Sequence, residues 1–302
     1  SPNYATITQA LAASSSGDTI YVAYGTYNEN IDIQISINIV GVMSGPNRPV
    51  ISSSNNNDPI IDIINTDINV IIRNFEIDGN GGNSVAGIRS SITPTDTLGV
   101  EIDNCVIHGM SGTGSGIKLY NNANSHWIHD CNIYSNYNGI TMNNSDSNLV
   151  EDCVIHNNQN DGIYVYGDEN DFEDNTINDN GYCGIELYDS WDCLIASSYY
   201  GNTEIYDNEY GIYTSYCDDL TVIGSANDDY LCQVLVHNNT YEGIYTDQCD
   251  DLQISYTSTN DNGDDTDDGF YSYQSEHAIM DHVLFWDSMT LEYCSRNVTY
   301  WA

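Results

Sequence analysis

One stretch of the chain, residues 131–188, decides the fold because it repeats a short pattern three times. The copies read Cys131-Asn-Ile-Tyr-Ser-Asn-Tyr-Asn-Gly139-Ile140, Cys153-Val-Ile-His-Asn-Asn-Gln-Asn-Asp-Gly162-Ile163 and Asn175-Thr-Ile-Asn-Asp-Asn-Gly-Tyr-Cys-Gly184-Ile185. Their Gly-Ile pairs recur every 22 or 23 residues. A period in the low twenties, with short apolar pairs separated by Asn, Asp and Gly, indicates one coil of a β-solenoid rather than a helical repeat. Each coil must stack on its neighbour to bury its inner side chains.

The same pattern continues on both sides of this stretch. Gly-Ile pairs begin at Gly87, Gly116, Gly139, Gly162, Gly184, Gly211 and Gly243, with Gly269-Phe270 as a variant. A second apolar column, which we expect to point inward, comprises Trp127, Leu149, Phe172, Leu194, Leu220, Leu252 and Ile279. Together with an Asn-x-Ile column these give three inward strands per coil and roughly ten to twelve coils. The predicted fold class is all-β, a parallel β-helix.

The N-terminal residues predict a cap. Ile7, Ala10 and Leu11 have helical spacing and favour a short helix over 5–13 that covers an open end of the solenoid. The following segments, Gly17-Asp-Thr-Ile-Tyr-Val22 and Gly25-Thr-Tyr-Asn-Glu-Asn-Ile31, resemble the N-terminal signature of right-handed parallel β-helix repeat proteins, the pectate-lyase-like superfamily. This resemblance implies a right-handed parallel β-helix. It implies no single function, because the scaffold serves lyases, hydrolases, epimerases, adhesins and structural surface proteins.

Repeats that share one core favour a single domain over residues 1–302. Within it we expect an N-terminal cap at 1–19, coils at 20–296 and a C-terminal strand at 297–302. That strand ends in Tyr300 and Trp301 without a polar cap. We expect these residues to serve assembly by pairing with a neighbouring copy, so that the chain is its own partner in an end-to-end homo-oligomer or filament.

The charge excludes one class of partner. Lys and Arg number 5 against 45 Asp and Glu, which gives a net charge of −40 that repels nucleic acid. No apolar run reaches membrane-spanning length, so membrane insertion is not expected. The chain begins at Ser1 without Met, and Asn143, Asn238 and Asn297 head glycosylation sequons. These features favour a mature secreted protein with its signal peptide removed, at an extracellular or cell-surface location. They leave open whether the acidity reflects high salt, cation binding or a solvated surface.

The acidic loop 260–268 contains the candidate metal ligands. Its carboxylates surround Gly263 and offer the oxygen ligands that Ca²⁺ prefers, although the spacing is not that of an EF-hand. The candidate metal ligands are Asp261, Asp264, Asp265, Asp267 and Asp268. Ca²⁺ is the candidate cofactor, and a solvated charge cluster is the alternative.

The nine cysteines divide into two kinds of position. Cys105, Cys131 and Cys153 share a column that we expect to be buried as small apolar residues, with a metal site or disulfide as the alternative. Cys217 and Cys249 lie in Cys-Asp-Asp-Leu repeats on adjacent coils, within disulfide reach of each other, and are the candidate disulfide.

Three further columns follow from aligning the coils. Asn136, Asn158, Asn180, Asn208 and Asn239 form a column that we expect to hold a corner through stacked amides. One outward column reads Lys118, Thr141, Tyr164, Glu186, Tyr213, Tyr245 and Tyr271, and a second reads His108, Tyr134, His156, Asn178, Tyr206 and His237. The outward aromatics could stack sugars, contact another subunit, or simply pack across strands.

Catalytic motifs are weak in this sequence. A polysaccharide lyase needs basic residues near an acidic sugar, but Arg48, Arg73, Arg89, Lys118 and Arg296 are thinly spread. Asp218, Asp219, Asp250 and Asp251 could supply hydrolytic carboxylates, and Asn65-Thr-Asp67 resembles one hydrolase motif whose companion motifs are missing. We therefore expect a noncatalytic structural protein of a cell-surface layer, sheath or filament. The alternatives are a carbohydrate-active enzyme, hydrolase or lyase, and a carbohydrate-binding adhesin, with polysaccharide as the partner.

Overall fold

A computed structural model describes residues 3–55, 57–65, 67–82, 84–92, 99–198, 200–226, 231–263, 268–285, 287–294 and 299–301. It divides into two compact units, unit 1 (1–148) and unit 2 (149–302), each of which is described by itself. The predicted single domain with its internal boundaries stays a prediction.

Unit 1 begins with the predicted helix, α1 (Ile7–Ala12). Thr6 caps it by accepting a hydrogen bond from the Gln9 backbone at 3.1 Å, and Ile7 and Ala10 are buried. The helix contacts β1 (Thr19–Val22) and β3 (Ile31–Ile33) of the first coil. The cap expected from the sequence is therefore present.

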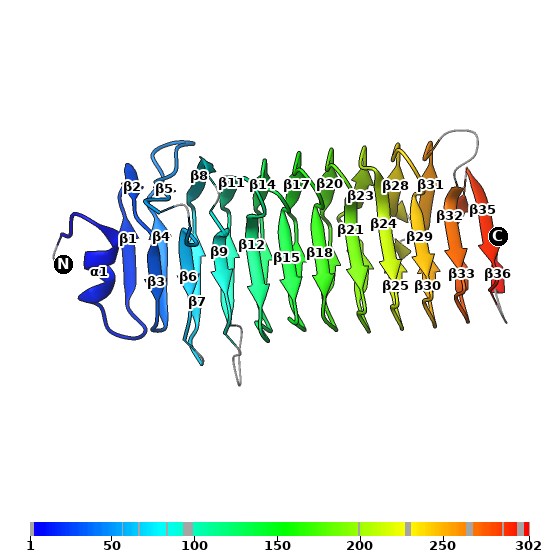
Figure 1. Cartoon of the computed structure of the whole chain (residues 1–302), viewed down its shortest axis with the longest axis horizontal. Coiled ribbons are helices and arrows are strands. Elements are labelled where there is room, and N and C mark those ends of the chain that lie inside the picture. The colour runs from blue at the N-terminus through cyan, green and yellow to red at the C-terminus, as the bar shows by residue number, and fades with distance from the viewer. Residues whose placement is uncertain are drawn as a thin grey trace. The chain divides into compact units, whose positions relative to one another are not determined.

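Three parallel sheets, which we call A, B and C, build unit 1 (Figure 1). Sheet A comprises β1 (Thr19–Val22), β4 (Ile37–Gly41), β7 (Val70–Arg73), β10 (Val100–Asp103) and β13 (Trp127–His129). Sheet B comprises β2 (Thr26–Asn28), β5 (Val50–Ser52), β8 (Glu76–Gly82), β11 (Val106–Met110) and β14 (Asn132–Tyr134). Sheet C comprises β3 (Ile31–Ile33), β6 (Ile61–Ile63), β9 (Ala86–Ser90), β12 (Ser115–Tyr120) and β15 (Ile140–Asn143). The chain visits A, B and C in turn, so each visit to all three is one coil.

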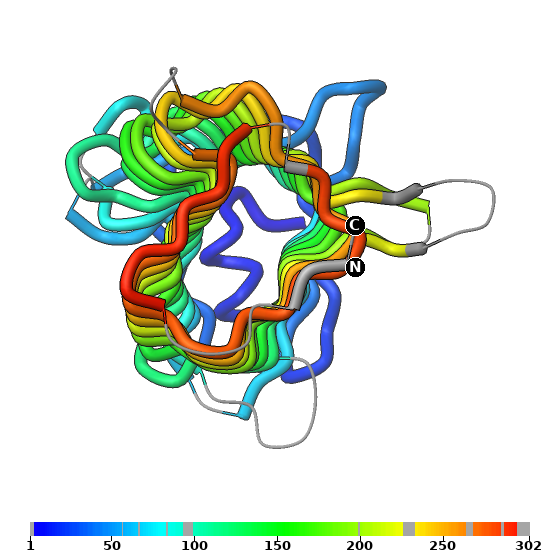
Figure 2. Tube along the Cα trace, turned by 90° about the vertical axis from the view of Figure 1, so that its right-hand side faces the viewer, coloured from blue at the N-terminus to red at the C-terminus, as the bar shows by residue number. Residues whose placement is uncertain are grey.

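Unit 2 repeats the arrangement. Sheet A comprises β16 (Leu149–Glu151), β19 (Asp171–Glu173), β22 (Leu194–Ala196), β25 (Thr221–Ile223), β30 (Gln253–Ser255), β33 (Ile279–Asp281) and β36 (Thr299–Trp301). Sheet B comprises β17 (Val154–His156), β20 (Thr176–Asn178), β23 (Thr203–Tyr206), β28 (Val234–His237), β31 (Thr257–Asn260) and β34 (Leu284–Phe285). Sheet C comprises β18 (Ile163–Tyr166), β21 (Cys183–Tyr188), β24 (Tyr210–Ser215), β29 (Ile244–Asp247), β32 (Asp268–Tyr273) and β35 (Ser288–Glu292). An antiparallel pair, β26 (Ser225–Ala226) and β27 (Leu231–Cys232), projects from the coil (Figure 2).

The core of each unit consists of columns of like residues. Sheet B of unit 1 stacks Ile51, Ile77, Ile107 and Ile133 in register, all fully buried. Parallel strands stack at about 4.8 Å, which places each inward side chain on its counterpart one coil away. The Gly of each Gly-Ile pair permits this approach, because a Cβ at Gly184 would lie 2.4 Å from the Ile205 side chain. The residues that repeat in the sequence are therefore the residues that stack in the core.

The predicted Asn column forms a hydrogen-bonded ladder in unit 2. Asn208 accepts from the Asn180 side chain at 3.0 Å and donates to the Asn239 side chain at 3.2 Å. Asn158 and Asn262 extend the ladder at its two ends, and all five side chains are buried. The residue directly before each of these asparagines has a left-handed φ of 52° to 55°. These residues are Asn157, Asp179, Asp207, Asn238 and Asp261. Asn and Asp tolerate this conformation, which explains part of the Asp and Asn content.

The second apolar column was predicted wrongly by one residue at several coils. Phe172 is buried, but its partners in register are Val150 and Ile195 rather than Leu149 and Leu194. Ile279 points outward and is 51 % exposed, because Met280 takes the inward place beside Ile254. Successive strand residues face opposite sides, so a slip of one residue reverses the assignment.

The all-β parallel β-helix fold with a short N-terminal helix is confirmed. Among the described residues no helix has the length and apolar character needed to cross a membrane.

Candidate functional site

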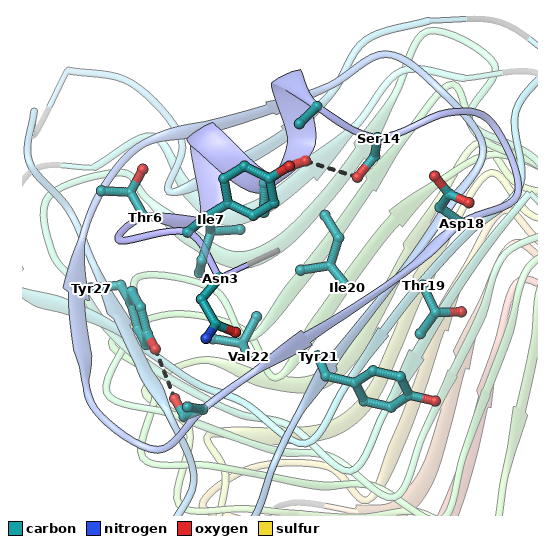
Figure 3. Close-up of a pocket in the computed structure, with 14 residues that line it drawn as sticks. Asn3, Thr6, Ile7, Ser14, Asp18, Thr19, Ile20, Tyr21, Val22 and Tyr27 are labelled. Atoms are coloured by element: carbon teal, nitrogen blue, oxygen red, sulfur yellow. Dashed lines mark hydrogen bonds between the residues drawn. The ribbon is translucent and has the colours of Figure 1, made fainter. Parts of the chain in front are cut away.

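A pocket of about 750 Å³ lies between α1 and the first coil of unit 1 (Figure 3). Ile7, Ile20 and Val22 line it, and the Tyr27 hydroxyl donates to the Ala23 carbonyl at 2.9 Å. Asp18 brings the one carboxylate of its lining and already accepts a backbone hydrogen bond at 2.8 Å. Without a pair of acid and base groups this pocket is space left beside a short cap, and the chemistry must be sought elsewhere.

The outer face of sheet C in unit 2 carries the predicted outward column. Tyr164, Glu186, Tyr213, Tyr245 and Tyr271 occupy equivalent positions on β18, β21, β24, β29 and β32. The Tyr213 and Tyr245 rings stack with centroids 4.8 Å apart, and those of Tyr245 and Tyr271 lie 5.2 Å apart. These rings therefore use their faces on one another, and the Tyr271 hydroxyl donates to the Glu292 carboxylate. Cross-strand packing, one of the alternatives, is therefore realised here.

Three further tyrosines widen this surface. The Tyr210 ring meets Tyr213 nearly edge-on at 5.4 Å and Tyr182 at 5.5 Å, and Tyr241 lies 5.1 Å from Tyr210. We call the set of Tyr164, Tyr182, Tyr210, Tyr213, Tyr241, Tyr245 and Tyr271 the tyrosine face. It is a rigid, hydroxyl-bearing surface with both apolar and polar contact area, which suits recognition of hydroxyl-rich ligands.

A pair of carboxyl groups lies within the tyrosine face, where Glu186 stands between Tyr164 and Tyr213 in register. Asp161, in the turn before β18, is 1 % exposed, whereas Glu186 on β21 is half-buried. Their ligating oxygens and the Cys183 sulfur all lie within 4.8 Å of one another. The Asp161 carboxyl also accepts hydrogen bonds from the Cys183 backbone at 3.2 Å and from the Asn160 amide at 2.7 Å. The turn thus holds Asp161 beneath the more accessible Glu186.

Burial sets the protonation of this pair. Loss of solvent, followed by the neighbouring Glu186 charge, raises the pKa of Asp161 to about 8, and burial also raises the pKa of Glu186. Two carboxyl groups this close share a proton more readily than they both ionise. The pair therefore holds a proton near neutral pH, which makes it a proton donor.

The surroundings are acidic throughout. Burial, then Glu242 and Glu209, raises the pKa of Tyr210 to about 12. Burial, then Tyr245 and Asp247, does the same for Tyr213. These tyrosines therefore stay neutral hydroxyl groups. Among the described residues of unit 2 there is no Lys or Arg, so none of these side chains offsets the acidic residues around the tyrosine face.

The predicted Ca²⁺ ligands are only partly described. Asp264, Asp265 and Asp267 lie outside the described residues. Asp268 is buried and accepts a hydrogen bond from Ser288, while Asp261 is exposed. Neither belongs to the clusters of potential ligands found in the described part of the chain. Calcium binding at this loop stays a prediction.

The other predicted sites are placed but not tested. Asn143 and Asn238 are exposed, whereas Asn297 falls outside the described residues. Tyr300 and Trp301 lie in β36, where they pair with Met280 and Asp281 of β33 at the end of sheet A. Their role in assembly and the glycosylation sites stay predictions.

No disulfide joins the cysteines whose side chains the structure describes, namely Cys105, Cys131, Cys153, Cys183, Cys193, Cys217, Cys249 and Cys294. Cys105, Cys131 and Cys153 are buried core residues, as expected. Cys217 and Cys249 lie on neighbouring coils and hydrogen-bond each other. The candidate disulfide between them therefore stays a prediction.

Sequence analysis missed the carboxyl pair although it placed Glu186 in the outward column. The available signal was the residue before each Gly-Ile pair. Asn138, Asp161 and Cys183 occupy that place, and all three are buried. Acids occupy this place at Asp161, Glu242 and Asp268, and Asp161 is the most deeply buried of the three.

The comparisons with known proteins establish the family. Residues 59–227 match the family described as the right handed beta helix region. Because this match spans more than half of the chain, the protein belongs to that family, and the predicted membership among right-handed parallel β-helix proteins is confirmed. No curated protein sequence matches the chain.

Several solved structures share the fold. The A-module of mannuronan C-5 epimerase AlgE6 from Azotobacter vinelandii superposes with a TM-score of 0.65 at 15 % identity, covering 96 % of this chain and 93 % of that one. The corresponding module of AlgE4 superposes with a TM-score of 0.63 at 15 % identity, covering 96 % of this chain and 92 % of that one. The enzymatically active domain of tailspike protein 2 from bacteriophage CBA120 superposes with a TM-score of 0.53 at 13 % identity, covering 88 % of this chain and 38 % of that one. At these identities the likeness shows the fold.

These neighbours correct the expected function. We expected a noncatalytic structural subunit, yet the names of these structures are those of carbohydrate-active enzymes or an enzymatically active tailspike domain. The expectation relied on the absence of familiar motifs, and the Asp161–Glu186 pair shows that acid–base groups are present without them. The carbohydrate-active alternative is the better supported of the two.

Proposed function

We propose that this protein is a carbohydrate-active enzyme that cleaves a polysaccharide on the tyrosine face. The observation that carries the proposal is the Asp161–Glu186 pair, which holds a proton beside a row of neutral tyrosine hydroxyls. A carboxylic acid that stays protonated near neutral pH is the group that glycoside cleavage needs as its general acid.

Glu186 is the acid in this scheme because it is the more accessible member of the pair. Its proton passes to the glycosidic oxygen as the bond from that oxygen to the anomeric carbon breaks. A water molecule adds to the anomeric carbon, and its proton returns to the carboxylate, which restores the shared proton. Asp161 does not reach substrate and acts as a positioning residue: its own pKa is raised to about 8, and the proton that it shares with Glu186 reaches the substrate through Glu186.

The acidic surroundings suit this reaction. The anomeric carbon becomes positively charged in the transition state, and nearby carboxylates stabilise that charge. Glu209, Glu242 and Asp247 lie close enough to influence the pKa values of Tyr210 or Tyr213. They add negative potential over the tyrosine face.

The same charges select the substrate. An acidic glycan would meet these carboxylates with no Lys or Arg from the described residues of unit 2 to offset them. We therefore propose a neutral polysaccharide whose hydroxyls bond to the outward tyrosine hydroxyls. The epimerase names of the similar structures do not decide the substrate of this chain.

The test compares three proteins on a panel of neutral and acidic polysaccharides, with new reducing ends and binding measured separately. The wild type should cleave a neutral glycan, and Glu186→Gln should bind it but lose cleavage by at least about a hundredfold. Glu173→Gln is the matched control, since Glu173 on β19 is also a half-buried carboxyl group with a raised pKa but lies on sheet A. Equal activity of the two variants, or no cleavage of any glycan, would refute the proposal.

Location follows from the substrate. We propose that the enzyme works outside the cell, and the exposed sequon residues Asn143 and Asn238 support this placement. Fractionation of the source cells, with an antibody against the chain, tests it: recovery in the cytoplasmic fraction alone would contradict it.

A further inference from the structure

A second cluster of chemically active side chains lies in unit 1, on the outer face of sheet A. Arg73, Asp103 and His129 stand in register on β7, β10 and β13, and Glu101 precedes Asp103 by two residues on the same face. One ligating atom each from Glu101, Asp103 and His129 lies within 4.8 Å of the other two. None of these residues belongs to the tyrosine face.

His129 makes this more than a cluster of acids. The residue is 9 % exposed, and its Nδ1 lies 2.9 Å from the Asp130 carboxylate, which fixes the proton on that nitrogen. Its Nε2 is buried, makes no hydrogen bond within the described structure and lies 3.7 Å from Glu101. With Nδ1 protonated, Nε2 carries a lone pair that points toward a carboxylate. Two electron-rich groups face each other unless a cation lies between them.

The local charge also favours a bound cation. Glu101, Asp103 and Asp130 contribute three negative charges, and Arg73 offsets one through its ion pairs to Glu101, at 2.5 Å, and to Asp103. The surplus of two negative charges matches a divalent cation.

We propose that Glu101, Asp103 and His129 form a binding site for a divalent transition metal of the zinc class. Imidazole with two carboxylates suits Zn²⁺ and its neighbours, whereas Ca²⁺ and Mg²⁺ prefer oxygen ligands alone. Asp130 orients the imidazole as the carboxylate partners of metal-bound histidines do. The Trp127 ring stacks on His129 with centroids 3.9 Å apart and holds the imidazole plane from the other side.

Calorimetric titration with Zn²⁺ tests the site, after the protein has been stripped with a chelator. The wild type should bind one zinc ion per chain at this site, and tryptophan fluorescence should change as Trp127 senses the ion. His129→Gln should abolish this binding event, and Asp130→Asn should weaken it about 10- to 100-fold. His237→Gln is the matched control, since His237 also stacks on a ring, Tyr206, at 5.0 Å, but belongs to no ligand cluster among the residues that the structure describes. It should bind zinc as the wild type does.

Two results would overturn the proposal. One is equal zinc binding by His129→Gln and His237→Gln. The other is no zinc binding by the wild type; nitrogen NMR spectra of a doubly protonated His129 ring would then mean that an ion pair with Glu101 explains the geometry. If His129→Gln loses its circular dichroism signal, Glu101→Gln takes its place, because it removes a ligand from the exterior of the same sheet.

Discussion

The buried acid Asp161 makes a prediction about stability that does not depend on knowing the substrate. The folded protein keeps the Asp161 proton up to a pKa of about 8, whereas an unfolded chain releases it near 3.8. Between these values the folded state binds more protons, so raising the pH removes stability. Each pH unit in this window is worth about 1.4 kcal/mol, so the loss from about pH 5.5 to pH 8 is roughly 3 kcal/mol.

Asp161→Asn should remove this pH dependence. Asparagine fits the position, because Asn138 occupies the equivalent place before Gly139 in unit 1 and is buried there. At pH 8 the variant should melt on the order of 10 °C above the wild type, and at pH 5.5 the gap should narrow to a few degrees. The measurement is the melting temperature of both proteins at both pH values, monitored by circular dichroism.

Asp207→Asn is the control, since Asp207 is an exposed acid on the neighbouring coils of the same unit. It should leave the pH dependence of melting unchanged. If Asp161→Asn melts below the wild type at pH 8, or if its melting shifts with pH as the wild type does, the inference that Asp161 is a buried protonated acid is wrong.

Three further predictions address the tyrosine face, the ladder and the core. Tyr213→Phe keeps the ring stack but removes a hydroxyl, and should weaken glycan binding about fivefold in calorimetry with little change in melting; unchanged affinity would contradict the hydroxyl contacts. Asn208→Ala leaves ladder partners unsatisfied and should lower the free energy of unfolding by about 3 kcal/mol in denaturant titrations, against almost no effect of Ala at the exposed Asn202. Burial lowers the pKa of His126 to about 4, so the folded protein, which holds this ring neutral, loses stability as the pH falls below 6.5. His126→Gln should reduce this loss, and an identical dependence of the melting temperature on pH in the two proteins would disprove it.

The sequence by itself determined the fold class. The Gly-Ile repeat, the Asn column and the helical spacing of Ile7, Ala10 and Leu11 are local signals, and each reappears as a core column, a ladder or a cap. Stacked coils repeat one local conformation, so a pattern readable in a single coil specifies all of them. Where the pattern was ambiguous by one residue, as between Leu149 and Val150, the inward face was predicted wrongly because strand faces alternate.

The tertiary structure decided the candidate sites. Asp161 and Glu186 are 25 positions apart, and Glu101 and His129 are 28 apart, so their proximity depends on how many residues each coil uses. Among 45 acidic residues, the place of Asp161 before a Gly-Ile pair is a weak signal that Glu242 and Asp268 share. Burial distinguishes them, because a carboxyl group without solvent keeps its proton and an imidazole nitrogen without a hydrogen bond keeps its lone pair. Both properties arise only when neighbouring coils close over the side chain.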